Sequence, residues 1–238
     1  MIAAFHSSAR AQTKWTVDPA SSLAWWQMVP HMDHLWATTC PAEPSWRPGD
    51  GRSSQWFMRS LARAHTAADT NNIPMYPRFA ARDVCTDALR GEITARDTLN
   101  WTGVRGHIIV MADRLQTGQE QRDNYTRESL LETKKYPEIR FDIDSLVGVV
   151  EQADTVQGSV VGVLSLHGVS HPMEVAVRVW PEAGGRRVVG KFRVTAPELV
   201  DRFGLSSNAL GLGVGVRIWH YLYMGVDLLM RVQPEVDS

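Results

Sequence analysis

Few residues of this sequence have the types and the spacing that catalysis or metal binding requires. His31 and His34 flank Asp33, as some metal ligands do, but no third strong ligand lies near them in the sequence. The adjacent Arg122 and Asp123 could be a catalytic pair or a pair that contacts a ligand head group. Local hydrogen bonds that orient their own loop are the simpler interpretation. We predict neither a metal site nor a catalytic residue.

The sequence also lacks the signatures of common enzyme classes. It contains no GxSxG, no HExxH and no GxxxxGK[ST] motif. The glycine-rich run at 211–215 does not join a strand to a helix as a dinucleotide site would, so it indicates a flexible connection. The aromatic run at 218–223 is typical of packing or of a rim that contacts lipid. We predict that the protein is not an enzyme; an active site that these signatures do not reveal is the enzymatic alternative.

The sequence has two cysteines, Cys40 and Cys85, and neither belongs to a CxxC motif or to a zinc-ligand pattern. In an oxidising compartment they would pair, and closing that loop would add about 4 kcal/mol in the chain-entropy model. In a reducing compartment they would stay as two inert thiols. The sequence leaves both alternatives open.

Composition and charge argue against several kinds of partner. The 238 residues carry a formal net charge of -1 with basic residues scattered along the chain, so no basic surface for nucleic acid is predicted. No apolar run is long enough to cross a bilayer as a helix. Hydrophobic residues make up 44% of the chain and nine residues are tryptophan, which suits a sizeable core and an apolar cavity.

The elements that must position any site are mainly strands, because apolar and polar residues alternate with a period of two. A further segment, 22–29, is apolar on both faces, so its inner face is left open. Gly184-Gly185 predicts a hairpin, and 168–172 predicts another tight connection. Many strands and few helices predict a β-sandwich or a closed barrel. The predicted strands lie at 15–17, 108–112, 139–144, 156–166, 173–179, 188–194 and 226–231.

Other segments interrupt this strand pattern. Helices are predicted at 125–135, ending before Pro137, and after Thr195, whose capping box with Glu198 opens a helix that stops at Gly204. The proline-rich region of about 30–83 is interpreted as an insertion with a helix near 55–67. Residues 1–12 are interpreted as a tail, either disordered or left from a signal peptide.

Four segments, in order, resemble the YceI-like family of bacterial lipid-binding proteins. They cover most of 13–29 and 84–232. Two departures stand out: Ser21 occupies a position where the family usually has His, and the region 30–83 is normally short. The matching segments are Trp15-Thr16-Val17-Asp18-Pro19 with Ser22; Thr117, Arg122-Asp123 and Tyr136-Pro137-Glu138-Ile139-Arg140-Phe141; Leu164-Ser165-Leu166-His167-Gly168-Val169; and Phe203-Gly204-Leu205.

This resemblance implies an all-β fold, an eight-stranded antiparallel lipocalin-like barrel over 13–236 with one or two short helices and the insertion. It implies a cavity for a polyisoprenoid, an isoprenoid quinone or a fatty-acid-like amphiphile, with no other cofactor. It also implies a periplasmic or secreted protein and allows a homodimer. The identity of the lipid stays open because the insertion could reshape the mouth of the barrel.

Inward positions on the predicted strands are the candidate ligand contacts. Val160, Gly162, Leu164 and Leu166 share one face, and a glycine there leaves room for a guest. The alternative is that side chains fill the lumen. His167 could contact a head group or be an ordinary hydrogen-bonded turn histidine. The predicted ligand-binding residues are Trp26, Met28, Phe141, Ile143, Gly162, Leu164, Leu166, His167, Val175, Val177 and Phe192.

A different class of function is also compatible with the sequence. The predicted insertion contains Trp36, Trp46 and Trp56 among its prolines, which could form an exposed recognition surface for another protein. In that alternative the barrel would be a structural scaffold and lipid would be incidental.

Overall fold

The computed structural model describes residues 12–29, 35–39, 85–96, 101–117, 120–206 and 221–233. Several predicted features therefore lie outside the described residues: residues 1–11 of the predicted tail, most of the predicted insertion, the histidines of 31–34, Cys40 and the runs at 211–215 and 218–220.

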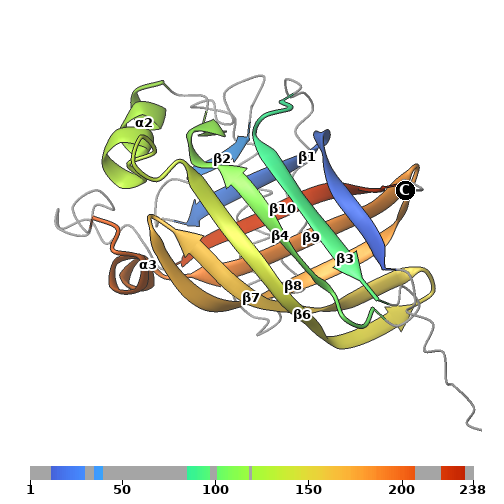
Figure 1. The fold of residues 1–238 in the computed structure, drawn as a ribbon. Helices are drawn as coiled ribbons and strands as arrows, with labels where there is room; N and C mark the ends of the chain where they lie inside the picture. The colour runs from blue at the N-terminus through green and yellow to red at the C-terminus, as the bar shows by residue number, and fades with distance from the viewer. Residues whose placement is uncertain are drawn as a thin grey trace, which may run out of the picture.

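Eight antiparallel strands close into a barrel (Figure 1). Following hydrogen-bonded neighbours, the ring runs β1–β3–β4–β6–β7–β8–β9–β10, and β10 pairs back with β1. Two short strands, β2 and β5, extend the sheet beyond β1. The predicted eight-stranded antiparallel barrel is confirmed. The strands are β1 (Thr13–Val29), β2 (Leu35–Thr39), β3 (Leu89–Ala95), β4 (Arg105–Met111), β5 (Leu115–Gln116), β6 (Glu138–Gln152), β7 (Thr155–Leu166), β8 (Val169–Glu182), β9 (Gly185–Val194) and β10 (Tyr221–Val232).

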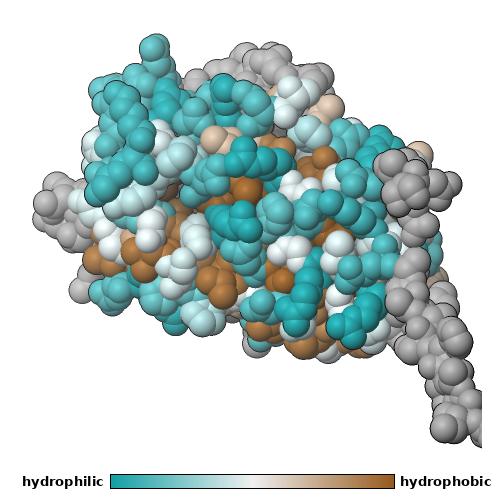
Figure 2. All heavy atoms as spheres, viewed as in Figure 1, coloured by the Kyte–Doolittle hydropathy of each residue, from teal (hydrophilic) through white to brown (hydrophobic). Residues whose placement is uncertain are grey.

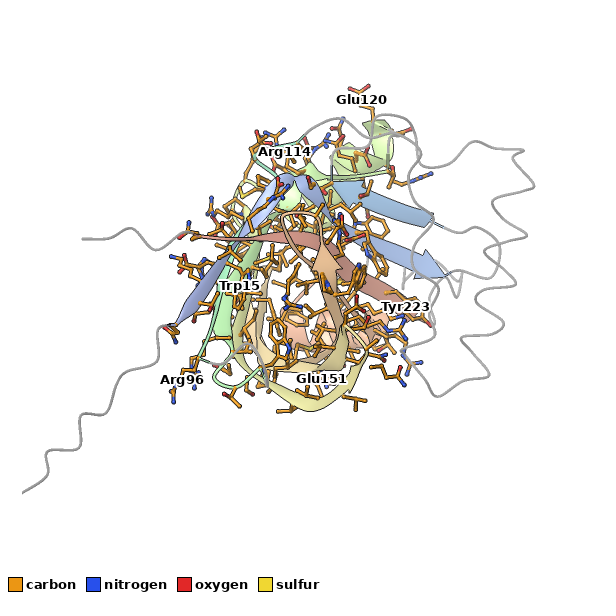
Figure 3. The ribbon with its side chains drawn as sticks, turned by 90° about the vertical axis from the view of Figure 1, so that its right-hand side faces the viewer. Trp15, Arg96, Arg114, Glu120, Glu151 and Tyr223 are labelled. Atoms are coloured by element: carbon orange, nitrogen blue, oxygen red, sulfur yellow. The ribbon has the colours of Figure 1, made fainter. Side chains whose placement is uncertain are left out.

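The inner and outer faces follow the sequence alternation. Leu164 and Leu166 are almost fully buried, whereas Val163 and Ser165, which alternate with them, are partly exposed. Figure 3 views the barrel nearly end-on, with the strands forming a wall around side chains that point inward. On the outside, Arg140 donates to Asp142 on the same strand at 2.6–2.9 Å. The face in Figure 2 mixes hydrophilic and hydrophobic side chains, with hydrophilic ones over α2 (Glu120–Tyr125).

Two hairpin turns connect β7 to β8 and β8 to β9. The hairpin predicted at Gly184-Gly185 is confirmed, since Glu182 pairs with Gly185. The connection predicted at 168–172 is shorter than expected, because Leu166 pairs directly with Val169. His167 and Gly168 form this turn with φ of 53° and 76°. Positive φ at both positions suits the type I′ turn, whose twist matches that of the flanking strands.

Strand β1 bends between Asp18 and Leu23, where its register with β10 shifts. The Ser22 hydroxyl donates to the Asp18 carbonyl at 2.6 Å and accepts the Leu229 N–H at 2.9 Å. Burial alone would raise the pKa of Asp18, but hydrogen bonds from Arg231 and Ser21 outweigh it and lower that pKa. The bend lets the start of β1 pair with β3 and its end pair with β2.

Short helical segments lie next to one end of the barrel. α2 (Glu120–Tyr125) continues into a π-helix, η3 (Thr126–Leu130), so the bounds predicted at 125–135 were wrong. Glu132 has φ of 46°, a conformation that a helix cannot continue through. α3 (Ala196–Phe203) begins with the predicted capping box and ends at Gly204 in the left-handed region, as predicted. A short 3₁₀ turn, η2, covers Ala112–Arg114.

Candidate functional site

The described residues line two cavities inside the barrel, and the larger of these has a volume of about 150 Å³ and lies at the helical end. Strands supply most of its wall through their inward positions. Its described lining contains no charged side chain, and Thr126 supplies a hydroxyl. The lining residues are Ala24, Trp25, Trp26, Ile108, Val110, Leu115, Thr126, Leu130, Leu131, Ile139, Phe141, Leu164, Leu166, Val175, Gly190, Phe192, Leu199, Leu205, Leu222, Met224, Gly225 and Val226.

The helical segments contribute part of this wall. Thr126, Leu130 and Leu131 from the η3 region and Leu199 from α3 all line the cavity. Their short length means that they depend on anchoring contacts rather than on intrinsic helix stability. The α2–η3 segment and α3 therefore act together as an apolar cap over this end of the barrel.

A buried carboxylate anchors the first half of that cap. Asp123, 4% exposed, accepts hydrogen bonds from both the backbone N–H and the hydroxyl of Thr117, each at 2.7 Å. Thr117 is itself 2% exposed and follows β5. Asp123 thus has the local orienting role proposed for the Arg122-Asp123 pair, because it ties α2 to the end of β5 through Thr117.

His167 connects the β7–β8 turn to both halves of the cap. One ring nitrogen lies 2.6 Å from the Glu132 carboxylate, and the other lies 3.3 Å from the Phe203 carbonyl at the end of α3. The His167 ring also packs on Tyr136, with centroids 4.4 Å apart. This is the hydrogen-bonded turn histidine of the sequence alternative, and His167 is not part of the cavity wall.

A second, smaller cavity of about 50 Å³ lies toward the opposite end of the barrel. Trp101 and Trp15 stack there with ring centroids 6.0 Å apart, and the Arg186 guanidinium lies 5.1 Å from the Trp101 ring. The lining residues are Trp15, Ile93, Trp101, Val104, Ile143, Leu146, Val160, Val177, Val179, Arg186, Val188 and Met230.

The residues predicted from the sequence as ligand contacts are divided between the linings of the two cavities. Gly162 and His167 line neither cavity, and the side chain of Met28 lies outside the described residues. The larger cavity is lined by Trp26, Phe141, Leu164, Leu166, Val175 and Phe192, and the smaller one by Ile143 and Val177.

Sequence reasoning missed the contribution of the cap and of β4. Ile108 and Val110 alternate with Ile109 in an unbroken apolar run, which does not reveal the inner face. Leu199 lies within the short helix α3 and Leu205 follows it, and no local pattern predicts how this helix docks. Gly190 could have been found, since it shares the face of Phe192 on β9.

The described residues show neither a cluster of metal-binding side chains nor a helix suited to span a membrane. They contain no group of three or more His, Cys, Asp or Glu side chains that could hold a metal ion. Over the same ranges, no helix combines the length and apolar character needed to cross a membrane.

Cys85 is disulfide-bonded. Cys40, the other cysteine of the sequence, lies outside the described residues, so the Cys40–Cys85 pairing stays a prediction.

The fold and the cavity define a class of protein: a closed antiparallel β-barrel with a largely apolar interior that contains cavities. The model of the YceI-like domain matches residues 62–219, and the chain belongs to this family. The match begins within the predicted insertion and does not include β1, although β1 closes the barrel. No curated protein matches the sequence.

Solved structures with the same fold have very different sequences. Burkholderia cenocepacia BcnA is 10% identical with a TM-score of 0.57, covering 89% of this chain and 98% of its own. A polyisoprenoid binding domain from Saccharophagus degradans, described as implicated in plant cell wall breakdown, is 13% identical with a TM-score of 0.55. That match covers 92% of this chain and 98% of the domain. At such identities the likeness extends to the fold alone.

Proposed function

We propose that this protein binds the apolar part of an amphiphilic lipid reversibly, in the larger cavity, without covalent chemistry. The ligand class is a polyisoprenoid, an isoprenoid quinone or a fatty-acid-like molecule. One observation carries the proposal: a cavity of about 150 Å³ whose described lining has no charged side chain. The polyisoprenoid binding of the Saccharophagus degradans domain, which shares the fold, supports the same class of ligand.

The energetics favour an apolar guest over a charged one. A tail that buries roughly 200 Å² of apolar surface gains about 5 kcal/mol at about 25 cal/mol per Å². An ionised group in the same position would lose its hydration without a partner, at a cost of several kcal/mol. A polar head group therefore has to stay at the mouth of the cavity while the tail enters.

We also propose that the protein works in the cell envelope or outside the cell. The disulfide at Cys85 supports this location, because disulfides persist in oxidising compartments and are rare in the cytosol. Peptide mapping of native protein without reductant should recover a Cys40–Cys85 linked peptide; two free thiols would contradict both the pairing and the proposed location.

Lipid binding can be tested by native mass spectrometry of the purified protein, before and after solvent extraction. The test variant is Phe141→Arg, because Phe141 lines the larger cavity and its replacement would place a charge there. The matched control is Val163→Arg, which adds the same side chain to the outer face opposite Asp142 in the β6–β7 pairing.

The expected result is that wild-type protein and Val163→Arg carry an apolar molecule, whereas folded Phe141→Arg carries none. Circular dichroism should verify that each variant keeps its strand content. Equal lipid retention in folded Phe141→Arg would contradict the placement of the ligand in this cavity. Absence of any apolar molecule from native wild-type protein, with no uptake of added prenols, would refute the proposal.

A further inference from the structure

The interior of the barrel is divided across its axis. On each of five strands, one inward residue lines the larger cavity and a nearby inward residue of the same strand lines the smaller one. The boundary therefore crosses the lumen at one level. The pairs are Phe141 and Ile143 on β6, Leu164 and Val160 on β7, Val175 and Val177 on β8, Gly190 and Val188 on β9, and Val226 and Met230 on β10.

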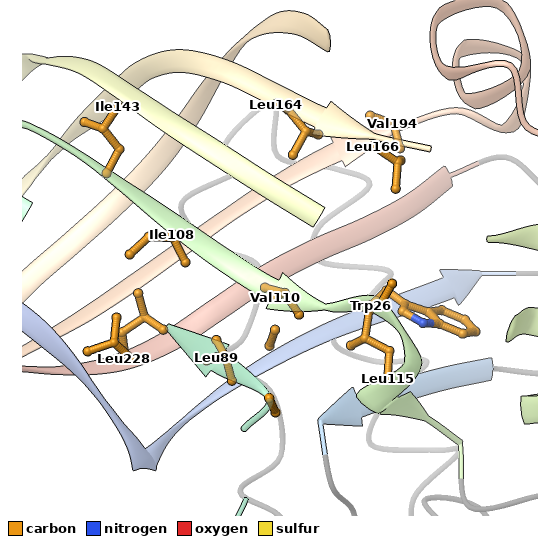
Figure 4. Close-up of a cluster of buried hydrophobic side chains, with 14 of the residues drawn as sticks. Trp26, Leu89, Ile108, Val110, Leu115, Ile143, Leu164, Leu166, Val194 and Leu228 are labelled. Atoms are coloured by element: carbon orange, nitrogen blue, oxygen red, sulfur yellow. The ribbon is translucent and has the colours of Figure 1, made fainter. Parts of the chain in front are cut away.

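Leu228 occupies this boundary on β10. It lies between Val226 and Met230 on the inward face, is 1% exposed, and lines neither cavity. In Figure 4, Leu228 and Ile143 lie toward one end of the buried cluster, while Trp26 and Leu115, which line the larger cavity, lie toward the other. The Leu228 side chain is thus part of the wall that separates the two cavities.

Gly162 and Phe141 complete the boundary on the β6–β7 side. A Cβ atom added to Gly162 would lie 2.1 Å from the Asp142 carbonyl oxygen and 3.0 Å from the tip of the Phe141 ring, so the β6 backbone and this ring together occupy the space that a side chain at 162 would fill. Gly162 itself lines neither cavity. The glycine allows the aromatic ring to reach toward the wall instead of leaving an open channel.

We infer that Leu228 and Phe141 set the maximum length of the lipid tail, so that this barrel selects a short prenyl or acyl chain. This inference rests on the proposed function. The four-residue step from Leu166 to Gly162 spans about 10 Å along the axis of a barrel with tilted strands. With carbon–carbon bonds of about 1.5 Å, that depth matches roughly two extended isoprene units. A longer tail can enter only if the wall moves.

The experiment compares affinities for geraniol, farnesol and geranylgeraniol, a series that lengthens by one isoprene unit at a time. Binding can be followed by tryptophan fluorescence, since Trp26 lines the cavity, and by native mass spectrometry. The test variant is Leu228→Ala. The matched control is Leu229→Ala, which removes the same atoms from the adjacent residue, 4% exposed, whose side chain points away from the lumen.

The affinity of wild type should stop rising once the tail reaches the wall. The affinity of Leu228→Ala should rise further when the tail is longer by one isoprene unit. For geranylgeraniol we expect Leu228→Ala to bind about tenfold or more tightly than wild type, a change typical of a methylene-scale difference in an apolar pocket. Leu229→Ala should keep the wild-type length profile. If Leu228→Ala fails to fold, Leu228→Val removes less volume and should shift the profile in the same direction.

Two other outcomes would overturn the inference in distinguishable ways. If wild type and the Leu228 variants bind with the same dependence on tail length, the wall does not limit the ligand, although lipid binding itself stands. If no prenol binds to any folded variant, the proposed function fails and the inference fails with it.

Discussion

Removing the Asp123 carboxylate should loosen the cap over the larger cavity. In Asp123→Ala the N–H and the hydroxyl of Thr117 lose their shared acceptor, and Thr117 is 2% exposed. Hydrogen bonds to a charged group are each worth about 1.5–3 kcal/mol. Part of this is offset because a buried charge is removed as well. We expect a net loss of about 3 kcal/mol in the free energy of unfolding.

The assay is urea unfolding followed by circular dichroism, together with a thermal melt. For a chain of this size about 3 kcal/mol corresponds to a fall in Tm of roughly 6–12 °C. Asp123→Asn keeps an acceptor oxygen and should lose only about 1 kcal/mol. Asp201→Ala, on the exposed side of α3, is the control and should stay within about 0.5 kcal/mol of wild type.

The functional consequence is a faster release of ligand. Asp123 positions the segment that supplies Thr126, Leu130 and Leu131 to the cavity wall, so bound prenol should dissociate faster from Asp123→Ala than from Asp201→Ala. If Asp123→Ala were as stable as Asp123→Asn and released lipid at the wild-type rate, the anchoring role of the carboxylate would be refuted.

Two further predictions concern the framework around the site. Gly168→Ala should lower the free energy of unfolding, measured in urea, by about 2 kcal/mol more than Gly148→Ala does. Both glycines have positive φ, but a Cβ added at Gly168 would lie 2.5 Å from the Tyr136 ring, whereas a Cβ added at Gly148 would have nothing within 4 Å. Similar losses would contradict this contact. The Thr195 backbone N–H donates to the Glu198 carboxylate and lowers the pKa of Glu198 below its ordinary value of 4.5. Above that pH, the free energy of unfolding of wild type should exceed that of Glu198→Gln by about 0.5 kcal/mol. This difference should disappear as the pH falls below 4.5 and the carboxylate is protonated. A difference that did not change with pH would count against the ionised capping box.

The sequence predicts the inward face of some strands but not of others, and it misses the short strand β2. The inner face of β7 follows from alternation, because Val160, Leu164 and Leu166 recur at every second or fourth residue. The segment 22–29 has no such contrast, and in the structure three consecutive residues, Ala24, Trp25 and Trp26, all line the cavity. The strand β2 lies in the region predicted as an insertion. The sequence pattern did not predict it, because the strand is short and the segments around it are rich in proline.

The site was predictable to a similar extent. Phe141, Val175 and Phe192 line the larger cavity as expected from their face of the sheet. Ile143 and Val177 lie on the same faces, yet they line the smaller cavity beyond the wall. The period of a strand determines which side of the sheet a residue occupies, but it carries no information on depth along the barrel axis.

The sequence by itself determined the strand alternation, the hairpin at Gly184-Gly185 and the capping box at Thr195, because each depends on neighbours within a few residues. Alternation left a sandwich and a closed barrel open, because closure pairs β1 with the distant β10. Tertiary structure alone decided how the interior is used. The bend of β1 is held by a hydrogen bond from the Leu229 N–H to the Ser22 hydroxyl, and the cap is held in part by the contact between the His167 ring and the Phe203 carbonyl. The division of the lumen likewise requires side chains from five strands to meet at one level. Such contacts join residues far apart in the chain, so no local pattern can encode them.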